Sequence, residues 1–384
     1  MSREKTKPRK ISRVFKAVAV IFAAVLTVAA GIAGGAVGLS YGVIAKDLDE
    51  QVRRVAELEA NPSAPVNEAD FADFDLSAQN PKINRIRVLN THNSYRKRLT
   101  QYIDFFAGNF LPKSVYEELV YEHGALTDQL NSGIRSFELD LHSKNGKFSV
   151  YHISKIDCGS FAPDFGLALK ELKIWSDNNP GHVPVTILLE YKNDPAFLDL
   201  FADKPDSAML SRLNDAVATA MGEEKLVTPA DVIGGYADMQ SAIAAENWPT
   251  LNDAKGKFVF LLHYGDGVTD KYIGLDKSLK SLALFPTVYA DSASDKRIDE
   301  YREYASYILC NTPDADGINA LVSAGYIVRT RADADMRKPE AQRTAALSSL
   351  AQIITTDYEK GRALPAGDYY LDLGNGKTVS LLTF

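Results

Sequence analysis

Residues 134–142 read Ile134-Arg135-Ser136-Phe137-Glu138-Leu139-Asp140-Leu141-His142. Successive side chains of a strand point to opposite faces, so Glu138, Asp140 and His142 share one face and the leucines share the other. Two carboxylates on one face repel each other, and they are costly to bury without a cation, a shared proton or a salt-bridge partner. We therefore interpret this strand as one wall of a site for a hard metal ion. An edge strand whose polar face meets water would show the same alternation.

The rest of the chain from residue 83 onward alternates short β-rich runs with longer helical patterns. We expect eight strands, at 86–90, 134–141, 148–151, 185–191, 257–262, 306–309, 326–329 and 352–356. Helical patterns occupy several of the links, at 114–130, 165–178, 208–221 and 338–351. This order predicts an α/β fold, a closed TIM-like (β/α)8 barrel. The barrel should be somewhat irregular, because the links before 148 and 326 are short. A hairpin is expected outside it, with arms at 369–373 and 378–383 that flank Gly374-Asn375-Gly376-Lys377.

Polar residues gather where the first four predicted strands end. His92 and Asn93 follow the first strand, and Glu138 and Asp140 lie late in the second. His152 comes at the end of the third strand, and Glu190 and Lys192 come at the end of the fourth. Each has an ordinary interpretation by itself, as a turn former, a rim histidine or a solvent-facing charge. Functional residues of such barrels lie at the C-terminal ends of the strands, so together these residues predict one site.

The residue types in this group indicate a chemistry. Asn93, Glu138, Asp140 and Glu190 offer only oxygen ligands, which suits Ca2+ or Mg2+. The two histidines remain free of the metal. One neutral and one protonated imidazole beside a hard cation can cleave a phosphodiester by general acid/base catalysis.

These motifs resemble the calcium-dependent phosphoinositide-specific phospholipase C family in its exported bacterial form. The resemblance is strong over residues 83–192 and rests on Thr91–Tyr95, Leu126–Arg135, Phe137–Asp140, His152, Trp175–His182 and Leu188–Lys192. It continues more weakly through Arg329–Asp333 and Thr355–Tyr358.

The resemblance implies a role for each matched residue. His92 would take the proton of the inositol 2-hydroxyl, and His152 would protonate the diacylglycerol oxygen that leaves. Calcium would be held by Asn93, Glu138, Asp140 and Glu190, and the product would be a cyclic inositol phosphate. Three cations at strand ends could hold the phosphate or the sugar, or could form surface ion pairs: Lys192, Arg329 and Arg331.

Two other functions fit parts of the pattern. A glycerophosphodiester phosphodiesterase or a phospholipase D-like barrel also combines a Glu-x-Asp motif, histidines and a metal ion. Such enzymes have His-Arg-Gly after the first strand, where this chain has His92-Asn93-Ser94. A catalytically dead, membrane-anchored binding protein should lack part of the set, and none of it is missing.

The N-terminal region differs from the barrel in composition. Residues 1–16 carry seven Lys or Arg and one Glu, and the remainder is acidic, which argues against nucleic acid as a partner. Residues 17–45 contain no charge, which predicts a transmembrane anchor or a long signal sequence and, by the positive-inside rule, an exported catalytic domain. Residues 46–80 are expected to be a linker with one helix at 47–60, and residues 81–384 to be the catalytic barrel. The lipid substrate would be met at the membrane surface.

Some residues have weaker assignments. The aromatic stretch 102–111 is expected in the core, with lipid contact as the alternative. His182 should lie at the opposite end of the barrel in a structural role. Cys158 and Cys310 are left without a pairing.

Overall fold

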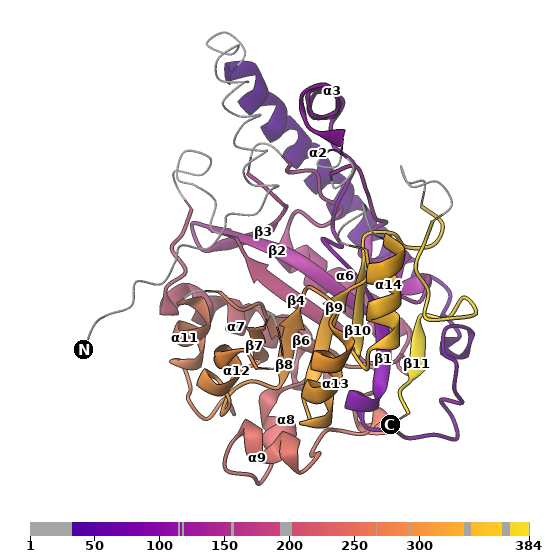
Figure 1. Ribbon diagram of the computed structural model, residues 1–384. Coiled ribbons are helices and arrows are strands. Elements are labelled where there is room, and N and C mark those ends of the chain that lie inside the picture. The colour runs from indigo at the N-terminus through magenta and orange to yellow at the C-terminus, as the bar shows by residue number, and fades with distance from the viewer. Residues whose placement is uncertain are drawn as a thin grey trace.

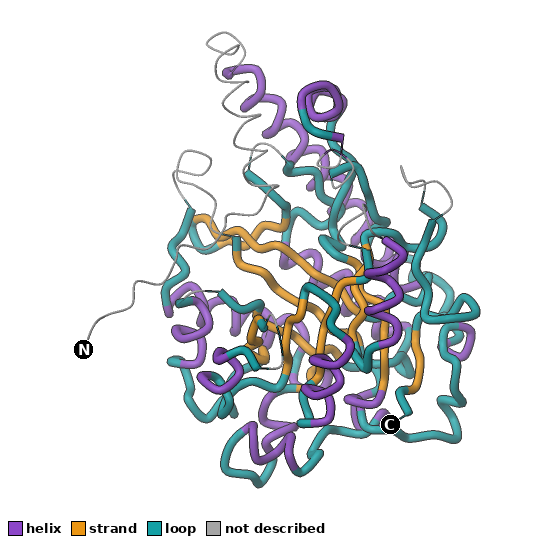
Figure 2. Tube along the Cα trace, viewed as in Figure 1, coloured by secondary structure: helices purple, strands orange, loops and turns teal. Residues whose placement is uncertain are grey.

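The computed structural model describes residues 33–113, 116, 119–154, 157–192, 202–265, 267–290, 292, 294–333, 339–362 and 369–383. Figures 1 and 2 show strands in the middle of the molecule with helices around them. Eight parallel strands close into a barrel: β1 (Ile86–Thr91), β2 (Ser136–Lys144), β4 (Val185–Tyr191), β6 (Phe258–Leu262), β7 (Leu284–Tyr289), β8 (Tyr307–Cys310), β9 (Ile327–Arg331) and β10 (Ile353–Thr356). Pairing of β1 with both β10 and β2 closes the ring, which confirms the predicted TIM-like barrel.

One predicted barrel strand is a hairpin arm instead. The run at 148–151 is β3 (Lys147–Val150), which pairs antiparallel with β2 through a two-residue turn. Both turn residues have positive φ, 53° at Asn145 and 75° at Gly146, as a type I′ turn requires. The link was too short for a helical crossover, so this strand could not be parallel to β2.

One strand of the barrel, β7, was not predicted. It contains Pro286, and a proline within an apolar run argues against a central strand because it removes a backbone donor. In the structure Pro286 pairs in register with Leu262, the last residue of β6.

Helices cover the barrel largely where the sequence predicted them. α6 (Phe165–Asn178), α7 (Ser207–Met221) and α14 (Pro339–Ser348) match predicted helices. The predicted helix at 114–130 is wrong over most of its described part: α5 is Leu126–Asn131, after an irregular stretch containing Gly124. The other short elements are α8 (Pro229–Ile233), α9 (Met239–Ala244), α10 (Leu251–Ala254), α11 (Val268–Ile273), α12 (Lys296–Glu300), α13 (Ala315–Ser323), η1 (Glu68–Asp70), η3 (Glu223–Lys225) and β5 (Leu226–Val227).

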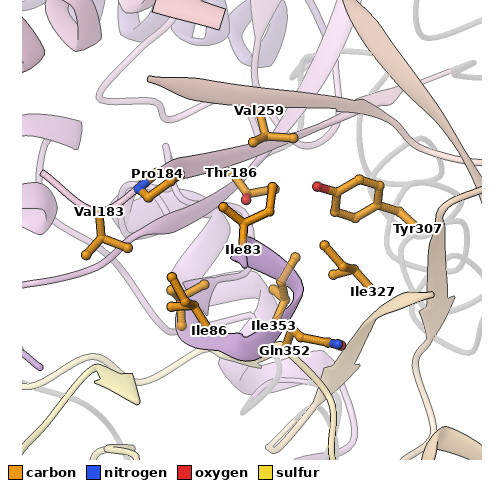
Figure 3. A pocket seen from close by; sticks show the side chains of 11 residues that line it. Ile83, Ile86, Val183, Pro184, Thr186, Val259, Tyr307, Ile327, Gln352 and Ile353 are labelled. Carbon is orange, nitrogen blue, oxygen red and sulfur yellow. The ribbon is translucent and has the colours of Figure 1, made fainter. Parts of the chain in front are cut away.

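The end of the barrel where the strands begin is filled. The 3-10 turn η2 (Ile83–Arg85) lies there, and apolar side chains leave a cavity of only about 30 Å³. Figure 3 shows Ile83, Val183, Tyr307 and Ile353 around it. This volume holds about one water, which is too little for a substrate.

The C-terminal segment completes the pairing of β1. β11 (Val379–Leu381) pairs antiparallel with residues 86–88, while β2 reaches only Asn90 and Thr91. The predicted turn is present, with Leu373 N–H donating to Lys377 O at 2.8 Å. The expected first arm, 369–373, is not a strand.

The N-terminal part of the described chain is the long helix α2 (Ala33–Ala60), which extends beyond one end of the barrel in Figure 1. Residues 17–32 of the predicted anchor lie outside the described residues. In the part of the chain that is described, no helix combines the length and the apolar character needed to cross a bilayer.

The segment expected to be a linker, residues 46–80, packs against the barrel. Asp47, Gln51 and Val55 of α2 are buried. Further along, Val66 N–H donates to Asn179 Oδ1 at 2.8 Å, and Arg135 donates to both carboxylate oxygens of Glu68. Polar composition suggested a spacer, but these polar groups find partners on the barrel.

The aromatic stretch forms α3 (Gln101–Phe110), and two of its rings are not in the core. Phe105 is 61% exposed and Phe110 67% exposed. The small buried cluster beside α3 is instead made of aliphatic residues, Leu99, Ala107, Leu119 and Val120. The expectation of a buried aromatic cluster is therefore wrong for these two residues.

Candidate active site and metal centre

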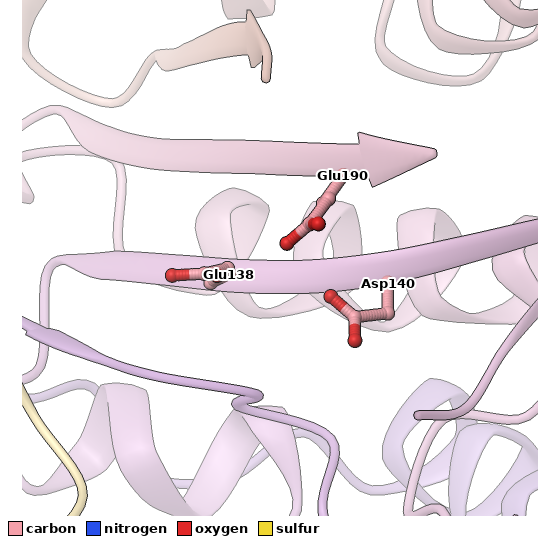
Figure 4. Close-up of side chains that lie close together, drawn as sticks. All are labelled: Glu138, Asp140 and Glu190. Carbon is pink, nitrogen blue, oxygen red and sulfur yellow. The ribbon is translucent and has the colours of Figure 1, made fainter. Parts of the chain in front are cut away.

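Three carboxylates meet inside the barrel, two on β2 and one near the end of β4. Asp140 and Glu190 are register partners on the two adjacent strands, and Glu138 lies two residues before Asp140. One oxygen from each lies within 4.8 Å of the others. Figure 4 shows Glu190 reaching from β4 toward β2. Glu138 and Asp140 are fully buried, so the predicted edge-strand alternative is excluded.

Basic side chains offset these charges. Lys192 Nζ lies 3.1 Å from Asp140 Oδ2 and 3.0 Å from Glu190 Oε1. Arg329 donates to Glu138 Oε2, and Arg331 lies 3.8 Å from Glu138 Oε1. All three predicted cations thus join the carboxylate cluster, and Lys192 and Arg329 are not surface ion pairs.

The carboxylates differ in their proton affinity. Burial disfavours ionisation of Glu138, but the charges of Arg329, His92 and Arg331 hold its pKa at about 2. Burial raises the pKa of Asp140 to about 8 although Lys192 lies beside it, because Glu190 and Glu138 add negative charge. Without a further cation, Asp140 therefore keeps a proton to higher pH than an ordinary aspartate does.

The donor set fits a hard cation such as Ca2+. All three carboxylates supply oxygen ligands. Within the described residues, Glu138 Oε1 and Asp140 Oδ1 are buried and accept no hydrogen bond. A buried polar atom without a partner is costly, and a cation between the strands would satisfy both oxygens.

Asn93 is connected to this cluster through Tyr95. The backbone of Asn93 has φ 50°, which asparagine tolerates better than most residues. Its amide nitrogen donates to the Tyr121 hydroxyl at 2.7 Å. The Tyr95 hydroxyl lies 3.3 Å from Asn93 Oδ1 and 2.9 Å from Asp140 Oδ2. Asn93 Oδ1 and Asp140 Oδ2 thus share the Tyr95 hydroxyl as a neighbour, and the role of Asn93 as a metal ligand stays a prediction.

His92 is oriented by a carboxylate at the end of β10. Its Nδ1 lies 2.7 Å from Asp357 Oδ1 and 3.1 Å from the Tyr121 hydroxyl. Its Nε2 faces Glu138, with 3.9 Å between Nε2 and Oε1. Burial and the charge of Arg331 lower the pKa of His92, although Asp357 and Glu138 act in the opposite direction. The neutral form, which can accept a proton, is favoured.

His152 has a similar orienting partner in a different loop. Its Nδ1 lies 2.8 Å from Asp157 Oδ2, and the Arg96 guanidinium lies 2.6 Å from the same oxygen. Arg96 is buried and packs over the Tyr121 ring at 4.8 Å. Burial lowers the pKa of His152, while Asp157 works against that shift.

An open cavity of about 490 Å³ lies at this end of the barrel. Its lining includes three basic side chains, two aromatic rings and an amide: Lys192, His263, Arg331, Tyr264, Tyr289 and Asn311. His92 and Glu190 also line it. The structure therefore brings together predicted residues that lie on or directly after β1, β2, β4 and β9. His152, among the described residues, lies outside this lining.

Several residues of the site were not predicted. Asp357 follows the end of β10, so the strand-end rule that identified His92 could also have found it. Asp157 and Arg96 lie in loops, and no spacing in the sequence connects them to His152. His263 lies directly after β6 and also lines the cavity.

Comparisons with known proteins agree with this geometry. The model of the family described as "Phosphoinositide phospholipase C, Ca2+-dependent" matches residues 82–150 and 143–381. The chain is similar to a calcium-dependent phosphoinositol-specific phospholipase C from a Gram-negative bacterium, Pseudomonas sp (apo form, myoinositol complex), with 18% identity and a TM-score of 0.55 over 80% of this chain and 98% of that one. It is also similar to a Ca2+-dependent phosphatidylinositol-specific phospholipase C from Streptomyces antibioticus, with 18% identity and a TM-score of 0.53 over 79% and 99%. These likenesses support the fold. No curated protein matches the chain.

Proposed function

Because the chain belongs to the Ca2+-dependent phosphoinositide phospholipase C family, we propose that it cleaves phosphatidylinositol-type lipids into diacylglycerol and a cyclic inositol phosphate. The chain is a phosphoric diester hydrolase, and Ca2+ is its cofactor. The observation that carries the proposal is the carboxylate cluster whose Glu138 Oε1 lies 3.9 Å from the Nε2 of the oriented His92.

The residues that would hold Ca2+ are Asn93, Glu138, Asp140 and Glu190. When bound, the ion supplies positive charge that lowers the pKa of the attacking hydroxyl and offsets charge on the phosphoryl oxygens. Lys192 and Arg331 line the same cavity and add further positive charge for a phosphate. Arg329 lies deeper and neutralises Glu138.

The chain's own groups move the protons. With Nδ1 held by Asp357, His92 accepts the proton of the inositol 2-hydroxyl at Nε2. The hydroxyl oxygen forms a bond to phosphorus, and the bond from phosphorus to the glycerol oxygen breaks. His152, held by Asp157, gives its proton to that leaving oxygen. The products are a cyclic phosphodiester of inositol and neutral diacylglycerol.

The test is a substrate panel presented to the full-length protein in detergent micelles with calcium. We expect turnover of phosphatidylinositol and little turnover of phosphatidylcholine or of glycerophosphodiesters. His92→Ala and His152→Ala should each lower kcat by about 10²- to 10⁴-fold, the usual contribution of an acid or a base. Turnover of glycerophosphodiesters in place of inositol lipids would contradict the head group and favour the phosphodiesterase alternative.

We further propose that the barrel lies on the outer side of the cytoplasmic membrane. It is either anchored there by the segment 17–45 or released after that segment is cleaved as a signal sequence. The support is the uncharged run at 17–45 after the basic residues 1–16. Cell fractionation combined with protease treatment of intact spheroplasts tests this. The barrel should be degraded without lysis if it stays anchored, or recovered outside the cells if it is released. Protection of the barrel inside intact cells would contradict the proposal.

A further inference from the structure

We propose that the helix α2 belongs to the catalytic apparatus, with Asp47 as a positioning residue for His152. The inference rests on the proposed role of His152 as general acid. α2 ends at Ala60, and the family match begins at residue 82, so this helix is outside the matched part of the chain. The family match therefore does not account for these contacts.

Asp47 is a buried carboxylate that joins α2 to two segments near the site. Its Oδ1 accepts from Lys97 Nζ at 2.6 Å, and its Oδ2 accepts from the backbone N–H of Ser160 at 2.9 Å. Asp47 is only 4% exposed and Ser160 is fully buried. Contacts to a buried, charged acceptor are among the stronger hydrogen bonds, so Asp47 holds the backbone at Ser160 firmly.

The loop that Asp47 holds is the one that orients His152. Asp157 lies three residues before Ser160 and accepts from both His152 and Arg96. The backbone N–H of Lys97 donates to Gly159 O at 3.3 Å, so the segment carrying Arg96 contacts the same loop. Asp47 thus ties together both chain segments that support Asp157.

Two further side chains of α2 extend the contact along this loop. Gln51 makes a pair of hydrogen bonds with the backbone of Asp164, each 2.9 Å. Arg54 donates to Phe161 O and pairs with Glu171 of α6 at 3.0 Å. Successive turns of α2 therefore contact residues 160, 161 and 164, which follow Asp157 in the chain.

Two roles of α2, stabilising the barrel or positioning His152, lead to different kinetics in α2 variants. If the helix only stabilises the barrel, its variants lose folded protein and leave the turnover of each folded molecule unchanged. If Asp47 positions His152, a variant loses general-acid catalysis, which matters for a poorly leaving alkoxide and little for a well-leaving phenolate. The ratio of the two rates therefore isolates the role of His152.

The experiment compares wild type, Asp47→Ala and Asp47→Asn as full-length protein with calcium. Two soluble inositol phosphodiesters serve as substrates, one with an alkyl alcohol and one with p-nitrophenol as the leaving group. The matched control is Val55→Ala, which truncates a buried apolar residue of α2 that cannot hydrogen-bond to the loop. Hydrogen exchange of residues 157–161 is measured in parallel.

For Asp47→Ala we expect kcat on the alkyl substrate to fall about tenfold, with kcat on the p-nitrophenyl substrate changed less than about twofold and KM unchanged. Amide exchange in residues 157–161 should rise. Asp47→Asn keeps an acceptor for the backbone N–H of Ser160, so its kcat on the alkyl substrate should fall only about threefold, again with little change on the p-nitrophenyl substrate. This variant preserves the test if Asp47→Ala does not fold. Val55→Ala should change neither rate for folded protein.

Equal loss on both substrates, or the same kinetics in Asp47→Ala and Val55→Ala, would overturn the inference. A wild-type protein that cleaves neither substrate would instead contradict the proposed function. Exchange in residues 157–161 would then decide separately whether Asp47 holds the loop.

Discussion

The contact between His92 and Asp357 fixes which ring nitrogen faces the cavity. A carboxylate at 2.7 Å from Nδ1 keeps the proton on that nitrogen and leaves the lone pair on Nε2. Burial alone would raise the pKa of Asp357, but His92 and Arg331 hold it below its usual value, so the carboxylate stays charged. An imidazole that gains a proton during turnover is stabilised by this charge.

Asp357→Asn removes that charge and keeps the shape. We expect kcat to fall by about 10²- to 10⁴-fold with little change in KM, because the wrong tautomer of His92 is then favoured. Calcium affinity, measured by titration calorimetry, should stay the same. Asp276→Asn is the control, since Asp276 caps a remote turn through Ser278 and Ser281. Unchanged kcat in Asp357→Asn would refute this role.

Asp140→Asn separates a metal ligand from a structural carboxylate. Removing one ligand charge should weaken calcium binding at least tenfold in calorimetry. The melting temperature without calcium should not fall, because burial already raises the pKa of Asp140 to about 8 beside Glu138 and Glu190. A lower melting temperature together with unchanged calcium affinity would mean that Asp140 serves the fold.

At the scale of single residues, the sequence predicted what lies on regular strands. Glu138, Asp140 and Glu190 were found from the period of two and from strand ends, and the structure brings them together. Asp157 could not be found in this way. Its contact with His152 depends on the path of an irregular loop, and loops carry no periodic pattern.

At the scale of elements, the barrel was predicted with one strand misplaced. β3 has the composition of a barrel strand, but the turn at Asn145 and Gly146 reverses its direction. β7 was not predicted, and it carries Pro286, which is untypical of a central strand. Helices with a clear apolar face, such as α6, were predicted at the residues where they occur. Local pattern thus identified strands and helices better than it identified how neighbouring strands pair.

The hairpin between β2 and β3 allows a matched pair of substitutions. An added Cβ at Gly146 would meet Arg212 at an ordinary 3.7 Å, so Gly146→Ala is costly only through its φ of 75°. We expect a loss of about 1–2 kcal/mol in the free energy of unfolding, measured in urea. Asn145→Gly keeps the positive φ accessible and should change stability by less than about 0.5 kcal/mol. Equal effects of the two variants would contradict the assigned turn.

In the molecule as a whole, the barrel end where the strands begin is closely packed, and the end where they finish carries the open cavity. The cavity of about 490 Å³ contrasts with the cavity of about 30 Å³ beneath the strands. His182 belongs to the closely packed end, as predicted from its place before β4. Its Nδ1 donates to Val183 O at 2.7 Å, and its Nε2 lies 2.8 Å from Ser176 Oγ of α6.

His182 makes the stability of the whole barrel depend on pH. Burial, with Arg135 and Lys225 nearby, lowers its pKa to about 3 in the folded state, while the unfolded value is about 6.5. Its contribution is thus complete above about pH 6.5 and is lost as the pH falls toward 3.

His182→Gln should reduce the stability difference between pH 7 and pH 5 by about 2 kcal/mol. Urea unfolding with a chelator present measures it without a contribution from calcium. An undiminished difference in the variant would show that His182 does not set this dependence.

The proposed reaction is calcium-dependent cleavage that closes an inositol phosphate ring. The most direct measurement is phosphorus NMR of phosphatidylinositol micelles incubated with the full-length protein. Spectra are recorded first with chelator and then after calcium is added. We expect no reaction with chelator, and after calcium a cyclic phosphodiester that appears before any acyclic inositol phosphate. Cleavage that proceeds equally well with chelator present, or an acyclic product at the first time point, would contradict the proposed reaction.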